Sequence, residues 1–390
     1  MDKDLLLKYL YISYLEARKH KRHTHSQMVF ESNLWENLVN LRDDIFNEKY
    51  VISPSIYFIQ MHPIQREVFA WNFRDRIVHH LIYNIITPHW EKQFIYDAYS
   101  CRKWKWTSKW IERISKFMRS CSNNYKEEWW ILKLDIQWYF MSISRDILWE
   151  KNRIVIDNWG KLSYFWKNNT NLWRYLIAWE FPIYLRKVIH DIIYNDPTEK
   201  WIFKGQQSDY NWLPPSKSLF NTPDDCGLPI GNLTSQLFSN IYLNEFDHYM
   251  KDELKLKYYW RYVDDFVIIH KDKEYLKSLI PQIKNYLQAD LKLRLHPNKV
   301  YLQPISHGVQ FLWAFIKPYR SYRSKRSVSN FYKKMRECNY MPSEESLNSY
   351  LWLFIKYKQY RLIQKIMKNV KFDNMKRISD LVKYYRDNSF

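Results

Sequence analysis

The chain has 390 residues, of which 61 are Lys or Arg and 41 are Asp or Glu, so its formal net charge is +20. This excess favours a polyanionic partner, nucleic acid first, over a neutral small molecule, and a basic surface kept for solubility is the alternative. Four widely spaced cysteines fit neither a disulfide framework nor a zinc site, and no apolar run approaches the roughly 18 residues of a membrane span. We therefore expect a soluble protein of the reducing cytoplasm.

In chain order, residues 1–50 are predicted to be helical, because apolar side chains recur three and four residues apart. Residues 51–130 mix short strands and helices and carry a dense set of cations. Residues 131–316 alternate β-rich segments with helices. Residues 317–390 are strongly basic and have helical spacing, with apolar positions such as Leu351 separated by cations.

Carboxylates stand at the ends of two apolar segments. Asp135 directly follows the strand-like run 131–134, and Asp264-Asp265 lies between two apolar runs, which predicts a hairpin with both acids at its tip. Adjacent acids repel each other unless a cation lies beside them. A third acid on a neighbouring strand would complete a ligand set for two Mg2+ ions. For Asp264-Asp265 alone, an ordinary polar turn is the alternative.

The order of these motifs resembles that of reverse transcriptases. Tyr-Val-Asp-Asp at 262–265 follows a strand that ends on Asp135, with the aromatic Phe140 five residues later, which is similar to the palm of these polymerases. Most reverse transcriptases carry Gln-Gly and then Ser-Pro in the next palm segment. This chain has Ile-Gly at 230–231 and Ser-Gln at 235–236, which resembles the reverse transcriptases of diversity-generating retroelements, one group of the group II intron-like bacterial enzymes. Other segments that resemble this group are 66–70, 73–80, 213–219 and 295–299.

The resemblance implies an α+β right-hand polymerase. Its parts would be a helical N-terminal extension (1–50), fingers (51–130), a ferredoxin-like palm (131–316, with part of the fingers inserted at about 150–222) and a basic helical thumb (317–390). It implies an RNA-directed DNA polymerase that copies a template RNA into cDNA with errors concentrated at adenines. The implied partners are template RNA, the cDNA or primer, deoxynucleoside triphosphates and a small helical accessory variability protein that forms a pentamer.

The resemblance also implies roles for single residues. Asp135, Ile136, Asp264 and Asp265 would hold the two Mg2+ ions, and Lys299 would donate a proton to the leaving pyrophosphate. Further residues are implied in nucleotide binding, namely Arg66 and Arg102 as triphosphate clamps, Phe140 as a steric filter against the 2′-hydroxyl, and Ile230, Gly231 and Gln236. The primer grip would contain Gly308, Phe311 and Leu312. For the two arginines, a surface position or a salt bridge with Glu67 is the alternative.

Ile230 has the most specific consequence. A glutamine there could hydrogen-bond the nucleotide, whereas isoleucine offers only shape, so we expect weaker discrimination against mispairs. Physical reasoning predicts low fidelity, and only the resemblance points to adenine. A group II intron enzyme, an abortive-infection enzyme or another bacterial reverse transcriptase stays open, as does a catalytically silent RNA-binding scaffold.

Glycine and tryptophan are out of balance, with 5 Gly and 19 Trp, whereas a chain of this length averages about 27 Gly. Where this chain resembles the family, the family has glycine at seven positions that are tryptophan here. These are Trp104, Trp106, Trp138, Trp212, Trp260, Trp313 and Trp352. We hypothesise that many tryptophans of this chain are native glycines encoded by UGA, a codon that some bacteria read as glycine and other code tables read as tryptophan.

Overall fold

The computed structural model describes most of the chain, namely residues 1–19, 24–61, 65–102, 105, 107–159, 181–205, 213–311, 314–340, 347–348, 350–351, 354–355, 357 and 360–369. Several residues singled out above lie outside the described residues, and these are Trp104, Trp106, Trp212, Leu312, Trp313 and Trp352. The chain divides into two compact units. The first contains 1–104, 134–266 and 278–300, and the second contains 105–133, 267–277 and 301–390. These units cut across the predicted fingers, palm and thumb, whose boundaries remain predictions.

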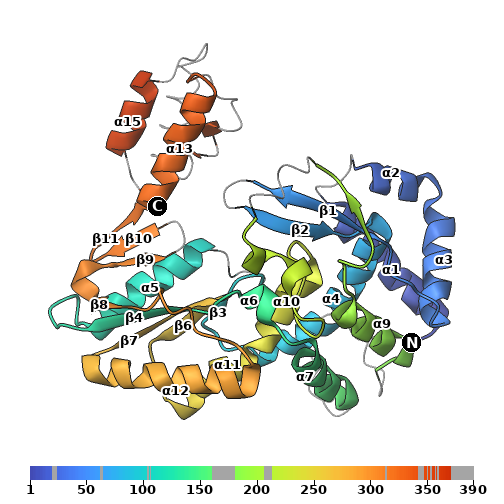
Figure 1. Cartoon of the computed structure of the whole chain (residues 1–390), viewed down its shortest axis with the longest axis horizontal. Helices are drawn as coiled ribbons and strands as arrows, with labels where there is room; N and C mark the ends of the chain where they lie inside the picture. The colour runs from blue at the N-terminus through green and yellow to red at the C-terminus, as the bar shows by residue number, and fades with distance from the viewer. Residues whose placement is uncertain are drawn as a thin grey trace. The chain divides into compact units, whose positions relative to one another are not determined.

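Four helices begin the first unit: α1 (Lys3–Arg18), α2 (His25–Ser32), α3 (Leu34–Phe46) and α4 (Phe73–Gln93). The Asp2 side chain caps α1 by accepting a hydrogen bond from the Leu5 N–H at 2.8 Å. Leu6, Leu10 and Leu38, which belong to the apolar positions that recur at helical spacing in this segment, are fully buried. Helix α1 packs along α4 and α3 (Figure 1). The helical prediction for residues 1–50 is therefore confirmed for the described part of that segment.

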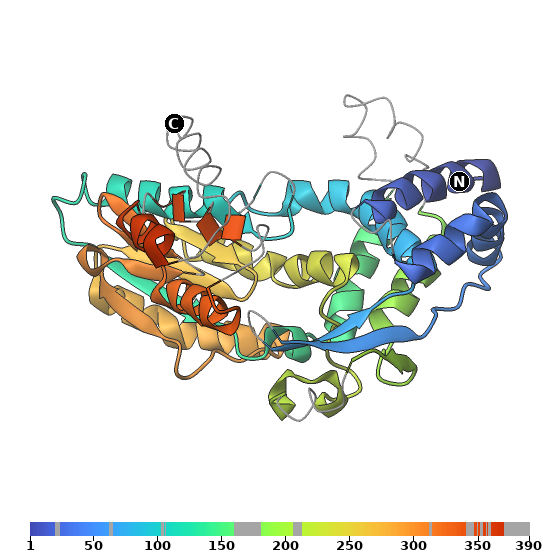
Figure 2. The same cartoon turned by 90° about the horizontal axis from the view of Figure 1, so that it is seen from above.

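A small sheet in the first unit has the order β2-β1-β5. Strand β1 (Ser55–Gln60) pairs antiparallel with β2 (Arg66–Ala70) and parallel with β5 (Trp201–Phe203). The paired β1 and β2 are seen as a long ribbon in Figure 2. The inner face of this sheet carries Tyr57 and Phe69, which form an apolar cluster with Met141 and Leu219. We call these four residues the fingers cluster.

A larger sheet has the strand order β3-β6-β7-β4-β8. Its strands are β3 (Ala98–Tyr99), β6 (Tyr259–Tyr262), β7 (Asp265–His270), β4 (Trp130–Asp135) and β8 (Tyr301–Pro304). Strand β3 runs parallel to β6, and β8 runs antiparallel to β4.

The helical elements of this part of the chain are α6 (Tyr139–Ser142), α7 (Arg145–Asp157), α9 (Ile183–Tyr194), η4 (Pro215–Lys217), η5 (Leu219–Asn221), α10 (Leu233–Tyr242), α11 (Asn244–His248), the π-helix η6 (Tyr249–Glu253) and α12 (Lys273–Leu291). The mixture of helices and sheets confirms the predicted α+β class.

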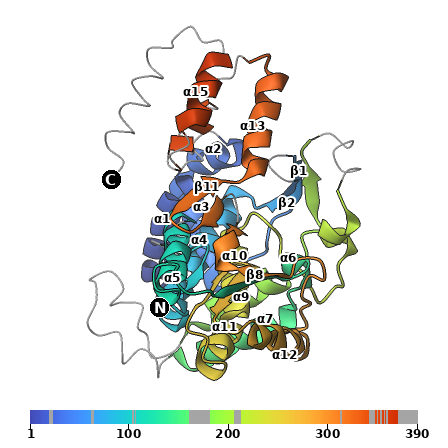
Figure 3. The same ribbon diagram turned by 90° about the vertical axis from the view of Figure 1, so that its left-hand side faces the viewer.

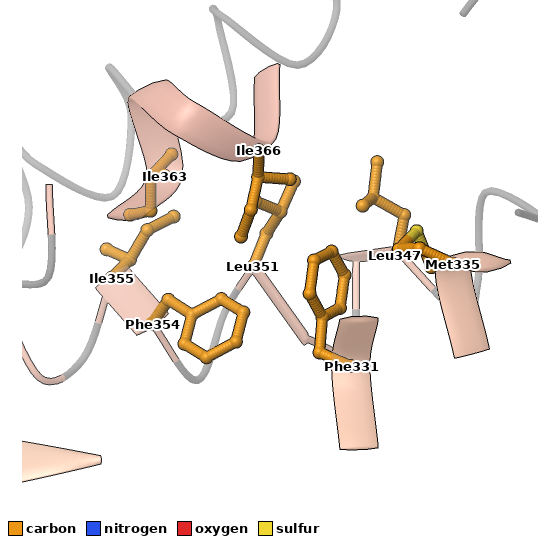
Figure 4. Close-up of a cluster of buried hydrophobic side chains, with 8 residues drawn as sticks. All are labelled: Phe331, Met335, Leu347, Leu351, Phe354, Ile355, Ile363 and Ile366. Carbon is orange, nitrogen blue, oxygen red and sulfur yellow. The ribbon is translucent and has the colours of Figure 1, made fainter. Parts of the chain in front are cut away.

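The second unit contains α5 (Thr107–Cys121), η7 (Ile305–His307), β9 (Val309–Phe311), β10 (Ala314–Lys317), β11 (Arg320–Arg323), α13 (Lys325–Glu337) and α15 (Tyr360–Asn369). Strands β11, β10 and β9 form an antiparallel sheet. Helices α13 and α15 lie side by side (Figure 3). Eight buried apolar side chains pack between them and residues 347–355 (Figure 4), and these are Phe331, Met335, Leu347, Leu351, Phe354, Ile355, Ile363 and Ile366. Six of the eight, namely Leu347, Leu351, Phe354, Ile355, Ile363 and Ile366, lie at the apolar positions that the helical spacing of this segment predicts.

Among the described residues, no helix combines the length and the apolar character that crossing a membrane requires. All four cysteines, Cys101, Cys121, Cys226 and Cys338, are free thiols.

Trp138 occupies a backbone conformation that suits glycine. It caps the N-terminus of α6 with φ +51° and ψ +38°, in the left-handed region, and its side chain is 47% exposed. A residue with a Cβ atom is strained there by about 1 kcal/mol relative to glycine. Trp260, by contrast, lies fully buried in β6. The geometry therefore supports the glycine hypothesis at position 138 and is silent on it at position 260.

We expect Trp138→Gly to raise the free energy of unfolding by about 1 kcal/mol, because the substitution removes a strained side chain that is largely exposed. Urea unfolding would measure the change. Trp149→Gly is the matched control: it lies inside helix α7, where glycine is a poor helix former, so it should lower stability.

The same hypothesis makes a statement about the gene. If position 138 is a native glycine, its codon is UGA, and a UGG codon there would contradict the hypothesis even if Trp138→Gly proved stabilising.

Candidate active site

The three acids predicted to be catalytic lie in the first unit, at the end of one strand and on a turn beside it. Asp135 is the last residue of β4, and Asp264 lies in the turn that joins β6 to β7, of which Asp265 is the first residue. The Ile136 N–H donates to the Asp264 carbonyl oxygen at 3.2 Å. This backbone hydrogen bond joins the end of β4 to the acidic turn, so the predicted hairpin and its neighbouring strand are both present.

A second connection ties the end of β4 to residues 294–299. The His296 N–H donates to the Asp135 carbonyl oxygen at 2.8 Å, and the Gln137 N–H donates to that of Arg294 at the same distance. These bonds hold the segment that follows α12 against the strand end. As a result, Lys299 lies beside the acids although it is far from each of them in sequence.

The Lys299 ammonium donates to both carboxylate oxygens of Asp135, each at 2.9 Å. Burial alone would lower the pKa of Lys299, but the hydrogen bonds and the charge of Asp135, with smaller contributions from Asp264 and Asp265, raise it above its ordinary value. A raised pKa makes the ammonium a weaker acid. Proton donation by Lys299 therefore requires this ion pair to open first.

Asp264 shows how strongly the acids oppose one another. Burial, followed by the negative charges of Asp265 and Asp135, raises the pKa of Asp264 to about 7. Lys299 lowers it only in part. A site that keeps carboxylates this close together is short of positive charge, which is the condition that a bound cation relieves.

Carboxylate and backbone carbonyl oxygens are the donors that hard divalent ions prefer, so the chemistry of this donor set fits a divalent metal ion. In the described part of the chain, no three acidic, histidine or cysteine side chains converge closely enough to hold a metal ion in their present positions. The Lys299 ammonium occupies both oxygens of Asp135. Metal binding would therefore exchange this ammonium for a metal ion.

The predicted nucleotide-binding residues Phe140 and Ile230 lie on two segments that are joined by backbone hydrogen bonds. Phe140 is half-buried on α6, and its carbonyl oxygen accepts a hydrogen bond from the Leu228 N–H at 2.8 Å. The Gly227 N–H donates to the Ile143 carbonyl oxygen at 2.9 Å. This ladder connects the segment of Phe140 to the chain that leads to Ile230.

Ile230 is partly buried and packs against the fingers cluster of Tyr57, Phe69, Met141 and Leu219. Gly231 has φ +110°, and a Cβ there would lie 2.9 Å from Val68 Cγ1. The backbone thus approaches strand β2 at a point where only glycine fits without movement. Gln236, also predicted in nucleotide binding, is half-buried on α10.

The two arginines predicted as triphosphate clamps differ. Arg66 is exposed at the start of β2. The alternative of a salt bridge with Glu67 is not supported, because the Glu67 carboxylate accepts hydrogen bonds from Ser218 Oγ and the Leu219 N–H, both at 2.7 Å. The clamp role of Arg66 stays a prediction, with a plain surface position as the remaining alternative.

Arg102 has a different environment, and the structure does not support a clamp there. Its side chain is 6% exposed and forms an ion pair with Glu91 at 2.9 Å. It also donates to the carbonyl oxygens of Ile95 and Ala98, each at 2.8 Å. These partners use the guanidinium to brace the turn before β3, which leaves it poorly placed to grip phosphate.

The predicted primer grip lies in the second unit. Gly308 has φ +78°, and a Cβ there would come within 2.5 Å of the Ile316 carbonyl oxygen, so the turn requires glycine. The Phe311 side chain is fully buried and stacks on Trp110 with ring centroids 3.7 Å apart. Contact of this side chain with a primer is therefore ruled out in this arrangement, and only its backbone remains available for such a role.

Two charged residues near the site have contacts that the sequence analysis did not predict. Glu67 anchors η5 to β2 through Ser218 and Leu219, and burial raises its pKa although both hydrogen bonds act to lower it. Arg261, immediately before the Tyr-Val-Asp-Asp motif, is fully buried. A charged residue inside an apolar strand is the one sequence signal that could have drawn attention to either.

Substitution of Arg66 should change nucleotide binding, whereas substitution of Arg102 should change stability. Arg66→Ala should raise the KM for the incoming nucleotide about tenfold with little change in stability, because it removes an exposed charge. Arg102→Ala should lower the free energy of unfolding by about 2 kcal/mol, because it removes hydrogen bonds of a buried guanidinium. Steady-state kinetics and urea unfolding would measure the two effects, and a raised KM in a stable Arg102→Ala protein would restore the clamp.

Comparison with known proteins identifies a family match and a curated relative of this chain. Residues 65–313 match the family model described as reverse transcriptase (RNA-dependent DNA polymerase). Protein YkfC of Escherichia coli strain K12 is 23% identical over 357 residues, which are 83% of this chain and 80% of that protein.

Two solved structures show a more distant likeness. Telomerase from Candida albicans, in complex with a TWJ fragment of telomeric RNA, has a TM-score of 0.46 and 11% identity, with 87% of this chain and 60% of that chain covered. Apo telomerase from Candida tropicalis has a TM-score of 0.46 and 12% identity, with 90% and 66% covered. The chain thus spans less than two thirds of either telomerase. The family match itself covers well over half of this chain, and the protein therefore belongs to the reverse transcriptase family.

Proposed function

We propose that this protein is an RNA-directed DNA polymerase, a nucleotidyltransferase whose reaction centre is formed by Asp135, Asp264, Asp265 and Lys299. The observation that carries the proposal is that the Ile136–Asp264 backbone hydrogen bond and the Lys299–Asp135 ion pair bring the acidic turn and one ammonium to the end of β4, in a chain of the reverse transcriptase family. A scaffold that only binds RNA has no use for a buried acid beside two others, an arrangement in which burial and then the charges of Asp265 and Asp135 raise the pKa of Asp264 to about 7.

Enzymes of this family normally use divalent metal ions, and we propose two Mg2+ ions here. Asp135, Asp264, Asp265 and the backbone carbonyl of Ile136 would hold them. Bound ions would supply Lewis acidity, lowering the pKa of the primer 3′-hydroxyl and neutralising charge on the triphosphate. Lys299, once released from Asp135, would carry the proton that the leaving pyrophosphate requires.

The remaining residues would select and orient the nucleotide. Phe140 would lie beneath the sugar and exclude a 2′-hydroxyl by steric clash. Ile230, Gly231 and Gln236 would form the surface next to the base, and Arg66 would bind the triphosphate. Gly308 and the backbone of Phe311 would approach the primer.

The acidic turn provides the direct test. We expect the Asp264→Asn, Asp265→Asn double variant to lose primer extension on an RNA template by about a thousandfold or more, because metal-ion catalysis contributes several kcal/mol. Incorporation of radiolabelled deoxynucleotide would measure it. Asp290→Asn, at an exposed position of α12, is the matched control and should retain full activity. Equal cDNA yield from the double variant and the wild type would leave the scaffold as the better reading.

We further propose that the enzyme serves a diversity-generating retroelement, making error-prone, adenine-directed cDNA for replacement of a variable region. The support is Ile230-Gly231 with Ser235-Gln236, and the apolar packing of Ile230 on the fingers cluster. A template RNA and the accessory variability protein are the proposed partners, and the cytoplasm is the proposed compartment. Group II intron and abortive-infection enzymes are the alternative members of the family.

The DNA beside the gene separates these alternatives. A diversity-generating retroelement requires a template repeat and a variable repeat that differ mainly at adenines of the template. We expect sequencing of the flanking region to find such a pair. Flanking DNA without it, or a pair that differs evenly at all four bases, would favour one of the alternative enzymes and would leave the polymerase assignment intact.

A further inference from the structure

A fully buried ion pair lies directly behind the acidic turn. The Arg261 guanidinium, on β6, donates to Asp247 Oδ1 at 2.8 Å and to Oδ2 at 2.7 Å, and both side chains are inaccessible to solvent. The Tyr259 hydroxyl donates to the same carboxylate at 2.6 Å. All three residues are in the first unit, and none touches the reacting groups.

Stability alone gives little reason to keep such a pair. Taking two charges out of water costs several kcal/mol per ion, and replacing a buried ion pair by apolar side chains of similar volume is often neutral or stabilising. What apolar side chains cannot reproduce is directed hydrogen bonding. We therefore considered the other hydrogen bonds that the Arg261 guanidinium donates.

The remaining arm of the guanidinium reaches the acidic turn. Arg261 Nη1 donates to the Val263 carbonyl oxygen at 2.9 Å and, more weakly, to Asn240 Oδ1 at 3.3 Å. Val263 has φ +55°, a left-handed conformation that a β-branched residue rarely adopts. Such strain persists only where surrounding contacts determine it. The hydrogen bond to Val263 is one of those contacts, and the next two residues are Asp264 and Asp265.

Further hydrogen bonds connect Arg261 and Asn240 to the segment around β3. Asn240, on α10, donates to the Ser100 carbonyl oxygen at 3.0 Å, and the Arg261 N–H donates to the Asp97 carbonyl oxygen at the same distance. The Arg261 side chain thus connects the acidic turn to helix α10, and Asn240 together with the Arg261 backbone N–H extends this connection to the segment around β3. Asp247 fixes that side chain through two parallel hydrogen bonds, which set the direction of its third arm.

We propose that Arg261, oriented by Asp247, is a positioning residue that holds the Val263 carbonyl and thereby places Asp264 and Asp265 for metal binding. The inference rests on the proposed polymerase function. It assigns the ion pair to the geometry of the turn, in addition to any contribution to folding.

The test is a triple variant, Tyr259→Phe, Arg261→Met, Asp247→Leu, which replaces the buried polar group by apolar side chains of similar volume. We expect its melting temperature to stay near that of the wild type. Its rate of primer extension at saturating nucleotide should fall about 10-fold to 100-fold, and its affinity for Mg2+, measured by calorimetric titration without substrates, should weaken by a similar factor. An exposed ion pair on α7 supplies the control, Arg153→Met with Asp157→Leu, which should alter neither quantity.

A second variant covers the case in which the triple variant does not fold. Arg261→Lys keeps a charge for Asp247, but one ammonium cannot reproduce the forked contacts with Asp247 and Val263 together. We expect a folded protein with the same shift in Mg2+ affinity. Wild-type rate and Mg2+ affinity in either folded variant would overturn the positioning role. An inactive wild-type protein would instead contradict the proposed function, so the two failures are distinguishable.

Discussion

The site depends on holding like charges together. Three carboxylates near the end of one strand repel one another, and burial together with this repulsion raises the pKa of Asp264 to about 7. An arrangement of this kind cannot be maintained by the side chains themselves, so the backbone and the charges around it must impose it. The hydrogen bond from Ile136 to Asp264 fixes the two segments against each other, and Lys299 neutralises Asp135. These contacts within the first unit hold the acids in place.

Sequence patterns predicted the parts of the site that follow from local structure. An apolar run that ends on Asp135, and an acidic pair between two apolar runs, each specify a strand end or a turn, and the structure has both. What could not be predicted is which charged groups are occupied by long-range partners. Arg102 lies in a basic segment, but its guanidinium bonds carbonyl oxygens of Ile95 and Ala98 that no spacing rule identifies. Phe311 likewise could not be assigned to the interior of its unit before its partner Trp110 was known.

Positive φ angles divide the strained positions into two kinds. Trp138 is exposed at the start of α6, and among the described hydrogen bonds its side chain offers no compensation for the strain, as expected if the native residue is glycine. Val263 is also non-glycine at positive φ, but a buried guanidinium bonds its carbonyl oxygen. The Val263 carbonyl oxygen is held by a buried side chain, whereas that of Trp138 accepts the backbone N–H groups of Met141 and Ser142, a pattern that glycine would keep.

Ile230 connects the fold to the proposed error rate. Its apolar neighbours come from β1, β2, α6 and η5, so the surface that the proposed function places next to a base is set by packing among four separate elements. A polar amide in the same place would lose this packing or bury hydrogen-bonding groups without partners, which is unfavourable. Isoleucine is therefore compatible with a well-packed fingers cluster and supplies no directional contact to a nucleotide. On this view low fidelity needs no loosening of the site: a rigid apolar surface accepts any base that fits its shape.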